Sequence, residues 1–385
     1  MRLVPLVVIL ATLLAPVAVM AQPSVSGSSG EFDNDGSVWI LGSDFGSKST
    51  AAPIRWDNFD NGVDSTYIQT GGYWTSLQGG ACPDSIKPRY MDEYLRNGSG
   101  LNAYVGLQHN DNYSQYNMFY RSNIDFATNN KALVCFWVRY DFGVPNNGHQ
   151  IKLWRVSHDA PYTDQETYPN IFFNDSGPVP GGWDRYQFSP RAGCGEGAES
   201  IGGSRPTLLT WVRVMLEWDF GEVNVGDTGE LTIWHDNVVQ CTEDGLLSGQ
   251  TFICHADQTP HSVSFGQYAG NTPDTDIANE YFDDIYIDNT WARVEIGNAS
   301  TYSESDHKEM QIPSYWASDG DSIQITVNTG SFVEDDEAYL FVVDSDGDVS
   351  SGYQLIIGSS GVGAPEDPPA SVAPCDSVRA WSAGG

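Results

Sequence analysis

The chain has 385 residues, with 18 lysines and arginines against 51 aspartates and glutamates, and a formal net charge of −33. Nucleic acids and anionic membranes are poor partners for such a chain, which argues against both as binding targets. Only three of the cations lie after residue 213. An acidic ligand is therefore expected to bind the first part of the chain.

Residues 1–21 predict a secretory signal peptide. Arg2 precedes an apolar stretch, and the small residues Val19–Ala21 form a cleavage site. No other stretch is apolar for long enough to span a membrane. We therefore expect an exported protein, which is secreted, periplasmic or on the cell surface, and whose mature chain does not insert into a membrane.

The mature chain is too long for one small core, so more than one domain is expected. Short period-2 runs separated by Gly, Asn, Asp and Pro favour strands almost everywhere, and only residues 83–95 favour a weak helix. The predicted segments after the signal are a linker with one strand (22–53), a large β domain (54–292), a small β domain (293–358) and a flexible tail (359–385).

The stretch from Trp211 to Asp236 predicts two antiparallel strands around a turn rich in Gly, Asn and Asp. In the first strand, alternate residues form an apolar face, while the opposite face carries Arg213, Glu217 and Asp219. The charged face either meets water or serves a ligand, and the sequence leaves both possibilities open.

Four stretches of the sequence resemble strands of a known superfamily. W-V-R-V-M-L-E-W (211–218), E-L-T-I-W-H-D-N (230–237) and Y-F-D-D-I-Y-I (281–287) resemble strands of concanavalin A-like lectin and glucanase jelly rolls. K-L-W-R (152–155) is similar to a strand of jelly-roll polysaccharide lyases. The resemblance implies an antiparallel jelly-roll β-sandwich over residues 54–292. This fold hosts lectins, hydrolases and lyases, so it does not decide the function.

Both ends of the chain resemble immunoglobulin-like domains. D-G-S-V-W-I-L-G-S-D-F-G-S-K (35–48) resembles the opening of an IPT-type domain. A-Y-L-F-V-V-D-S-D-G-D-V-S (338–350) resembles the C-terminal Ig-like (E-set) domain of secreted carbohydrate-active enzymes. The resemblance implies a small Ig-like β-sandwich over residues 293–358, to which the N-terminal segment could lend a strand.

One catalytic hypothesis is glycoside hydrolysis. Glu217, Asp219 and Glu222 match the E-x-D-x-x-E pattern of laminarinase- and agarase-type hydrolases of this fold. A retaining hydrolase needs two carboxyls about 5 Å apart, which residues on one strand face can supply. Against this, Glu217-Trp218 resembles a later strand of that family than the catalytic one, so a solvent-facing or ligand-binding role stays open.

The second catalytic hypothesis is a polysaccharide lyase, with Lys152 and His158 as candidates. Such an enzyme needs a cation to neutralise a uronate carboxylate and a base to remove a proton. On a regular strand Lys152 and Arg155 have opposite parity, so a shared groove requires a bulge between them.

Sugar binding without catalysis is the third possibility. Sugar rings stack on exposed aromatic faces, while cations and amides bind hydroxyl and carboxylate groups. Aromatic residues also build sandwich cores, and isolated cations also form structural ion pairs, so those roles stay open. The residues expected to bind a ligand are Arg139, Trp154, Arg155, Trp183, Tyr186, Arg213 and Trp234.

The resemblance also implies that the first and last strands are neighbours, as in many jelly rolls. Acidic pairs on these presumed strands predict a structural calcium ion. These residues are Asp57, Asp60, Asp283 and Asp284. The D-S-D-G-D run at 344–348 lacks the later Glu of an EF-hand and predicts a hairpin turn instead. No organic cofactor is expected, because no Gly-rich phosphate loop stands between a strand and a helix.

Six cysteines in an exported chain favour disulfides. Cys241 and Cys254 close a short loop and are predicted to pair with each other.

These observations favour a secreted polysaccharide-binding protein. Two alternatives stay open. One is an enzyme of the same fold, a polysaccharide lyase or a glycoside hydrolase. The other is a non-catalytic structural or adhesive surface protein.

Overall fold

The protein is all-β in the computed structural model. The structure describes residues 21–68, 72–78, 84–108, 115–141, 150–158, 170–175, 185–189, 199–204, 206–223, 225, 228–244, 252, 259–270 and 277–359. Within these ranges the strands form four sheets, every pair is antiparallel, and a single 3₁₀ turn, η1 (Asp84–Ile86), is the only helical element. The all-β sandwich prediction is confirmed.

The weak helix expected over residues 83–95 is wrong. After η1, residues Arg89–Met91 form strand β5, which pairs with Asn102–Tyr104 at the edge of a sheet. Pairing with neighbouring strands outweighs a weak local helical preference. Among the described residues, no helix is long and apolar enough to cross a membrane.

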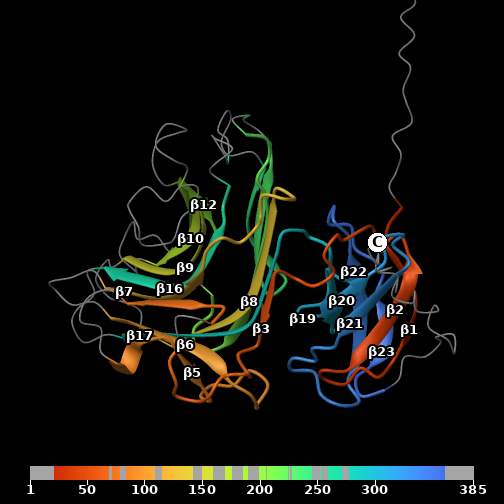
Figure 1. Cartoon of the computed structure of the whole chain (residues 1–385), viewed down its shortest axis with the longest axis horizontal. Coiled ribbons are helices and arrows are strands. Elements are labelled where there is room, and N and C mark those ends of the chain that lie inside the picture. The colour runs from red at the N-terminus through yellow and green to blue at the C-terminus, as the bar shows by residue number, and fades with distance from the viewer. Residues whose placement is uncertain are drawn as a thin grey trace, which may run out of the picture.

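Two large sheets form the first sandwich (Figure 1). The seven-stranded sheet has the order β12 (Glu199–Gly202), β11 (Arg185–Ser189), β10 (Asn170–Asp175), β9 (Gln150–Ser157), β16 (Ser262–Gly270), β7 (Gln115–Arg121) and β4 (Thr75–Gln78). The eight-stranded sheet has the order β15 (Val238–Asp244), β14 (Glu230–His235), β13 (Trp211–Asp219), β8 (Lys131–Asp141), β17 (Ile277–Asp288), β6 (Asn102–Gln108) and β5, with β3 (Arg55–Asp57) paired to β17.

Aromatic side chains fill the space between the two sheets. Phe136 of β8 and Phe282 of β17 meet Trp154 of β9 and Phe265 of β16, with ring centroids 5.1–6.0 Å apart where they pair. Alternate residues of each strand point inward, so the apolar parity of the sequence becomes the core. The inward face of β13 is the one predicted, with Val214, Leu216 and Trp218 in this core.

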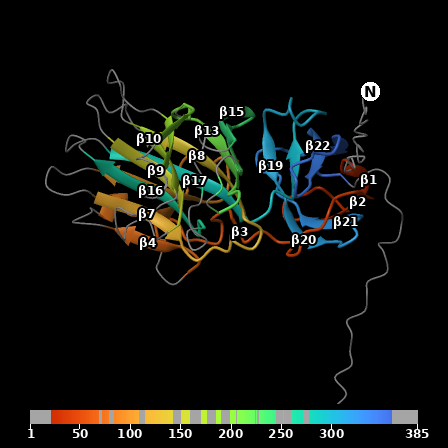
Figure 2. The ribbon, with the colours of Figure 1, turned by 90° about the horizontal axis from the view of Figure 1, so that it is seen from above.

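A second, smaller sandwich is built from both ends of the chain (Figures 1 and 2). One sheet has the order β1 (Ser24–Ser29), β2 (Ser37–Ser43), β21 (Ser322–Thr326) and β20 (Ile312–Trp316), and the other the order β19 (Lys308–Met310), β18 (Arg293–Gly297), β22 (Glu337–Val343) and β23 (Tyr353–Ile356). Val38 pairs with Ile325, so the N-terminal segment does lend strands to the C-terminal unit.

The predicted turn at 344–348 is present, because the Asp344 carboxylate accepts hydrogen bonds from the backbone N–H groups of Asp346 and Asp348. No disulfide lies among the described residues. Cys241 is buried on β15 and Cys254 lies outside the described ranges, so their pairing stays a prediction. Residues 1–20 and 360–385, which include most of the predicted signal and nearly all of the tail, also lie outside these ranges.

A buried carboxyl stands at one end of the first core. Glu280 of β17 is fully buried, and its carboxylate accepts no hydrogen bond from any residue that the structure describes. Burial raises the pKa of Glu280 well above 4.5. A carboxyl with a raised pKa in the folded state destabilises that state progressively as the pH rises above the unfolded value.

We expect Glu280→Gln to stabilise the protein at neutral pH, by up to about 1.4 kcal/mol for each pH unit above the unfolded pKa. Chemical denaturation at pH 5 and pH 8 measures this, and the advantage of the variant should grow with pH. Exposed Glu304→Gln is the control. An advantage that does not change with pH would show that Glu280 does not titrate as described.

Candidate functional site

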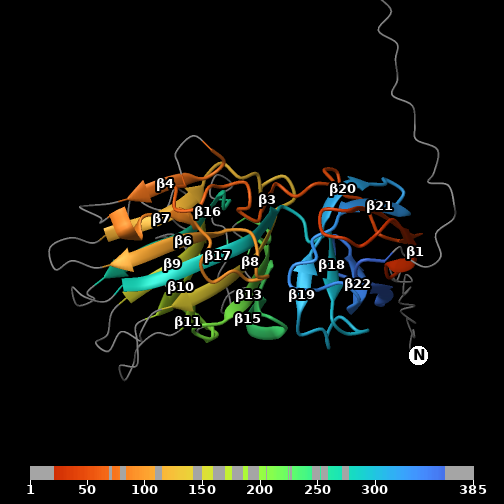
Figure 3. The same cartoon turned by 90° about the horizontal axis from the view of Figure 1, so that it is seen from below.

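The charged face of β13 is covered by the second sandwich. Arg213 is only 2% exposed, and its Nη2 donates to Glu295 Oε2 of β18 over 2.7 Å. The Glu217 carboxylate forms an ion pair with Arg293 of β18, also at 2.7 Å. Figure 3 shows β18 and β19 beside β8 and β13. We call this contact region between the two sandwiches the seam.

The charges of the seam neutralise one another in pairs. Burial alone would raise the pKa of Glu295, but the Arg213 and Arg293 guanidiniums lower it to about 2. Burial raises the pKa of Glu217, and Arg293 offsets this only in part. Both carboxylates therefore serve as structural partners of arginines.

The structure does not show the arrangement of carboxylates that the hydrolase hypothesis requires. Asp219 Oδ1 accepts the backbone N–H of Gly221 at 2.9 Å and so closes the end of the strand. Glu222 lies beyond β13 in an exposed turn. The three carboxylates of the motif therefore do not share one strand face, because β13 ends between the second and the third.

A cavity of about 120 Å³ in the seam includes Arg213, Glu217 and Trp234 in its lining. Trp234 is half-buried and packs against Met215 and its apolar neighbours in the seam. Lys152 belongs to β9 of the opposite sheet, so no common groove joins it to Arg213 and Glu217.

Two predicted sugar-stacking residues lie in the core. Trp154 and Tyr186 are fully buried with ring centroids 5.5 Å apart, and the Tyr186 hydroxyl hydrogen-bonds His235 Nε2 at 2.5 Å. Neither ring can present a face to a ligand, so the core role that the sequence left open is the one observed. Trp183 lies outside the described residues.

Arg155 lies on the outer face of the seven-stranded sheet. It stands in one row with Ser264 of β16 and Tyr120 of β7. The pairing of β9 with β10 shifts register between Arg155 and Lys152, whose partners Phe172 and Asn174 are two residues apart. This is the irregularity that a shared groove required; for Lys152 the structure describes the backbone alone.

His158 follows β9 at the end of the same sheet. Its ring lies 4.8 Å from that of His261, centroid to centroid, in an edge-to-face arrangement. The row of Arg155, Ser264 and Tyr120 is almost completely buried.

The predicted pairing of the first and last strands is observed, since β3 pairs with β17 and Ile285 lies opposite Asp57. The four acidic residues do not form one cage, however. Asp57 accepts hydrogen bonds from Phe59 N and Trp74 Nε1, and Asp60 accepts one from Leu101 N. In the described part of the chain, no group of three or more His, Cys, Asp or Glu side chains is arranged to hold a metal ion.

A row of aromatic and arginine side chains crosses the outer face of the eight-stranded sheet, beside the seam. Each member is the cross-strand partner of the next, so all of them share one face. The members, which we call the aromatic–arginine row, are Trp211, Arg139, Tyr281, Tyr104, Arg89 and Tyr67.

Tyr94 lies over the centre of this row. Its ring centroid is 5.0 Å from that of Tyr281 and 4.4 Å from the Arg139 guanidinium carbon, and its carbonyl accepts the Trp211 Nε1–H at 2.7 Å. At the other end, the Arg89 guanidinium lies 5.5 Å from the Tyr67 ring. Tyr94 is 45% exposed and Tyr67 39%, so the centre and one end of the row reach solvent, whereas the rings of Tyr281 and Tyr104 are buried, at 3% and 7% exposure.

Of this row, the sequence singled out Arg139 alone. Parity does place Arg139, Tyr281 and Tyr104 opposite the core residues on their strands. What parity cannot show is that they fall side by side, because that depends on the register of five strand pairings far apart in sequence.

We expect Glu295→Gln to lower the free energy of unfolding by about 3–5 kcal/mol, because it leaves two buried guanidiniums without their shared carboxylate. Ion pairing lowers the pKa of Glu295 from 4.5 to about 2. The Glu295 carboxylate therefore contributes to the free energy of unfolding fully above pH 4.5, and this contribution is lost as the pH falls through 2. Urea denaturation at pH 7 and pH 3 measures both effects. Exposed Glu337→Gln is the control, and an equal loss in the two variants would contradict the expectation.

No protein-family model matches the chain, and no curated protein is similar to it in sequence. Structural similarity is found to endo-β-1,4-glucuronan lyase from the fungus Trichoderma reesei, with 11% identity, 62% of this chain and 97% of that chain covered, and a TM-score of 0.41. Alginate lyase vAL-1 from Chlorella virus is 12% identical, with 57% of this chain and 93% of that chain covered and a TM-score of 0.39. The PL-14 alginate lyase from Aplysia kurodai is 10% identical, with 55% of this chain and 88% of that chain covered and a TM-score of 0.37. At these values the similarities carry no argument about a site in this chain.

Proposed function

We propose that the protein is an exported polysaccharide-binding protein, and that the aromatic–arginine row with Tyr94 binds the polysaccharide. The observation that carries the proposal is the row itself. It places three tyrosines, one tryptophan and two arginines in line across one sheet face, with Tyr94 above them.

The row has the length and chemistry that a sugar chain requires. Five strand spacings of about 4.8 Å give a row of roughly 24 Å, long enough for several sugar rings. Tyr94, Tyr67 and Trp211 offer flat apolar faces together with a polar group, while the rings of Tyr281 and Tyr104 are buried. The arginines offer several N–H donors in fixed directions for hydroxyl or carboxylate oxygens.

The charges around the row are mixed, so they do not select one class of polysaccharide. Arg139 and Arg89 are cationic, whereas Glu93 and Asp141 lie close enough to Tyr281 to contribute to its raised pKa. The row is thus less acidic than the chain as a whole. It suits a neutral polysaccharide or one with scattered uronates, rather than a densely charged polyanion.

A lyase is the second candidate, on the outer face of the seven-stranded sheet. The register shift in β9 supports it, because it returns the Lys152 and Arg155 positions to one face. Arg155 would neutralise a uronate carboxylate, and the Tyr120 phenol, two strands away, would serve as the base. Both residues are only 7% exposed, which is why this function is second to polysaccharide binding. Ultraviolet absorbance of unsaturated uronate products on a polysaccharide panel tests it, and silence on every polymer removes it for that panel.

We expect Tyr94→Ala and Arg139→Ala each to weaken binding by about tenfold or more, because the first removes a stacking face and the second a hydrogen-bonding cation. Affinity electrophoresis on gels that contain neutral or uronate-bearing polysaccharides measures this. Tyr315→Ala is the matched control, since Tyr315 is an exposed tyrosine of the second sandwich.

Equal retardation of all three variants would remove the row as the binding surface. Absence of retardation for the unmodified protein on every polymer would favour the structural or adhesive role instead.

A further inference from the structure

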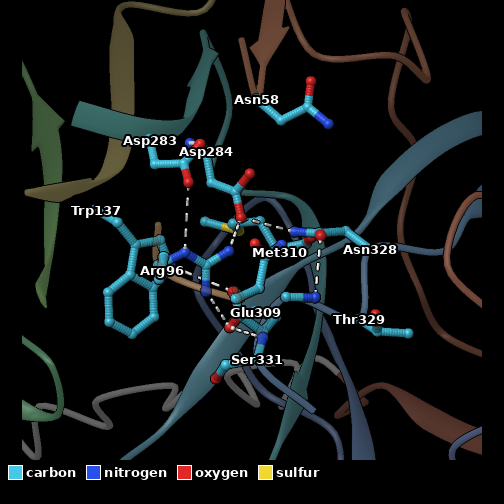
Figure 4. Close-up of polar contacts among 12 residues, drawn as sticks. Asn58, Arg96, Trp137, Asp283, Asp284, Glu309, Met310, Asn328, Thr329 and Ser331 are labelled. Carbon is cyan, nitrogen blue, oxygen red and sulfur yellow. Dashed lines mark hydrogen bonds and ion pairs between the residues drawn. The ribbon is translucent and has the colours of Figure 1, made fainter. Parts of the chain in front are cut away.

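Arg96 lies in the seam, where the sequence predicted calcium. Its side chain is 3% exposed, and its guanidinium carbon is 4.7 Å from the centroid of the Trp137 ring. Figure 4 shows the guanidinium between Asp283 and Asp284 of β17 on one side and Glu309 of β19 on the other.

The oxygens that would ligate a metal ion already face N–H donors. Asp284 Oδ2 accepts from Arg96 Nη2 and, at 3.2 Å, from Asn328 Nδ2. Glu309 Oε1 accepts from Arg96 Nη1 and, at 3.2 Å, from Ser331 N. Calcium takes six to eight oxygen ligands and no N–H groups. The residues present therefore do not fit a calcium ion at this position.

The remaining acidic side chains are occupied in the same way. Asp283 Oδ1 accepts its neighbour's backbone N–H at 2.9 Å, while Asp283 Oδ2 lies 4.0 Å from Arg96 Nε. Asp57 at the end of β3 accepts hydrogen bonds from Phe59 N and Trp74 Nε1. Asp60, in the loop that follows, accepts hydrogen bonds from Asn58 Nδ2 and Leu101 N.

Arg96 also joins the two sandwiches to each other. Its carboxylate partners come from both sandwiches, Asp284 from β17 and Glu309 from β19. Trp137, which packs under the guanidinium, donates its indole N–H to Glu309 Oε2 at 3.2 Å.

We propose that the Arg96 guanidinium takes the place of a structural calcium ion at the Asp283–Asp284 bend, and that it holds the two sandwiches together there.

Three carboxyls face Arg96, and burial acts on the pKa of each. Burial, reinforced by Asp284, raises the pKa of Asp283 well above its ordinary value. Burial likewise raises the pKa of Asp284, to about 6, although Arg96 opposes the rise. The pKa of Glu309 is lowered, because Arg96 and His307 outweigh its burial.

Two measurements on the full chain test the metal. Metal analysis of the purified protein should find no stoichiometric calcium, and its melting temperature should stay the same in EDTA and in added calcium. A drop in EDTA that calcium restores, and that Asp284→Asn abolishes, would overturn the proposal. A drop of equal size in Asp284→Asn would place the calcium elsewhere and leave Arg96 in this role.

A third measurement tests the guanidinium. Arg96→Met removes one partner of a buried charge cluster and should lower the melting temperature by about 10 °C. Arg121→Met is the control, since Arg121 packs on the Tyr73 ring away from the seam and should cost much less. Equal melting of Arg96→Met and the unmodified protein would sink the proposal. If Arg96→Met does not fold, the metal content and the EDTA response decide it.

Discussion

The arrangement of the molecule depends on a chain of buried ion pairs, in which Arg213 and Arg293 share Glu295 and Arg293 also binds Glu217. A buried charge without a partner is far more costly than a buried pair. Arg213 and Glu217 come from the first sandwich, whereas Arg293 and Glu295 come from the second. The ion pairs therefore bridge the two sandwiches, and the loss of one partner while the seam stays closed would leave a buried charge without its counter-ion.

This seam decides which part of the outer face of the eight-stranded sheet is covered. Arg213, Trp137 and Asp283 form one row across three strands, and the second sandwich covers it. One pleat further along the same strands lies the row of Trp211 and Arg139, which it leaves uncovered. Tyr94 and Arg96 belong to one segment, with Tyr94 on the uncovered row and Arg96 anchored in the covered one. The seam thus positions the exposed surface beside it.

The alternation of apolar and polar residues predicted those features of the fold that depend on neighbouring residues in the sequence. The β content and the inward face of β13 follow from parity and turn residues. The adjacency of the first and last strands and the strand lent by the N-terminal segment were implied by the family resemblances instead. The outward face of β13 could not be assigned, because water, a ligand and a second sandwich all tolerate Arg213 and Glu217 there. Arg96 escaped notice because it lies in a loop with no motif, and its three carboxylate partners follow it by some 190–210 residues.

The seam explains where the few cations in the acidic second part of the chain are used. Only three cations follow residue 213, and two of them, Arg293 and Lys308, lie buried in the seam. Burial lowers the pKa of Lys308 to about 8, and its ammonium donates to Asn237 across the seam. The surface of the second sandwich is left almost purely acidic, so it repels uronate-bearing polymers. If the proposed ligand carries negative charge, this distribution would favour its binding to the first sandwich, where Lys87, Arg89 and Arg139 lie along the uncovered row.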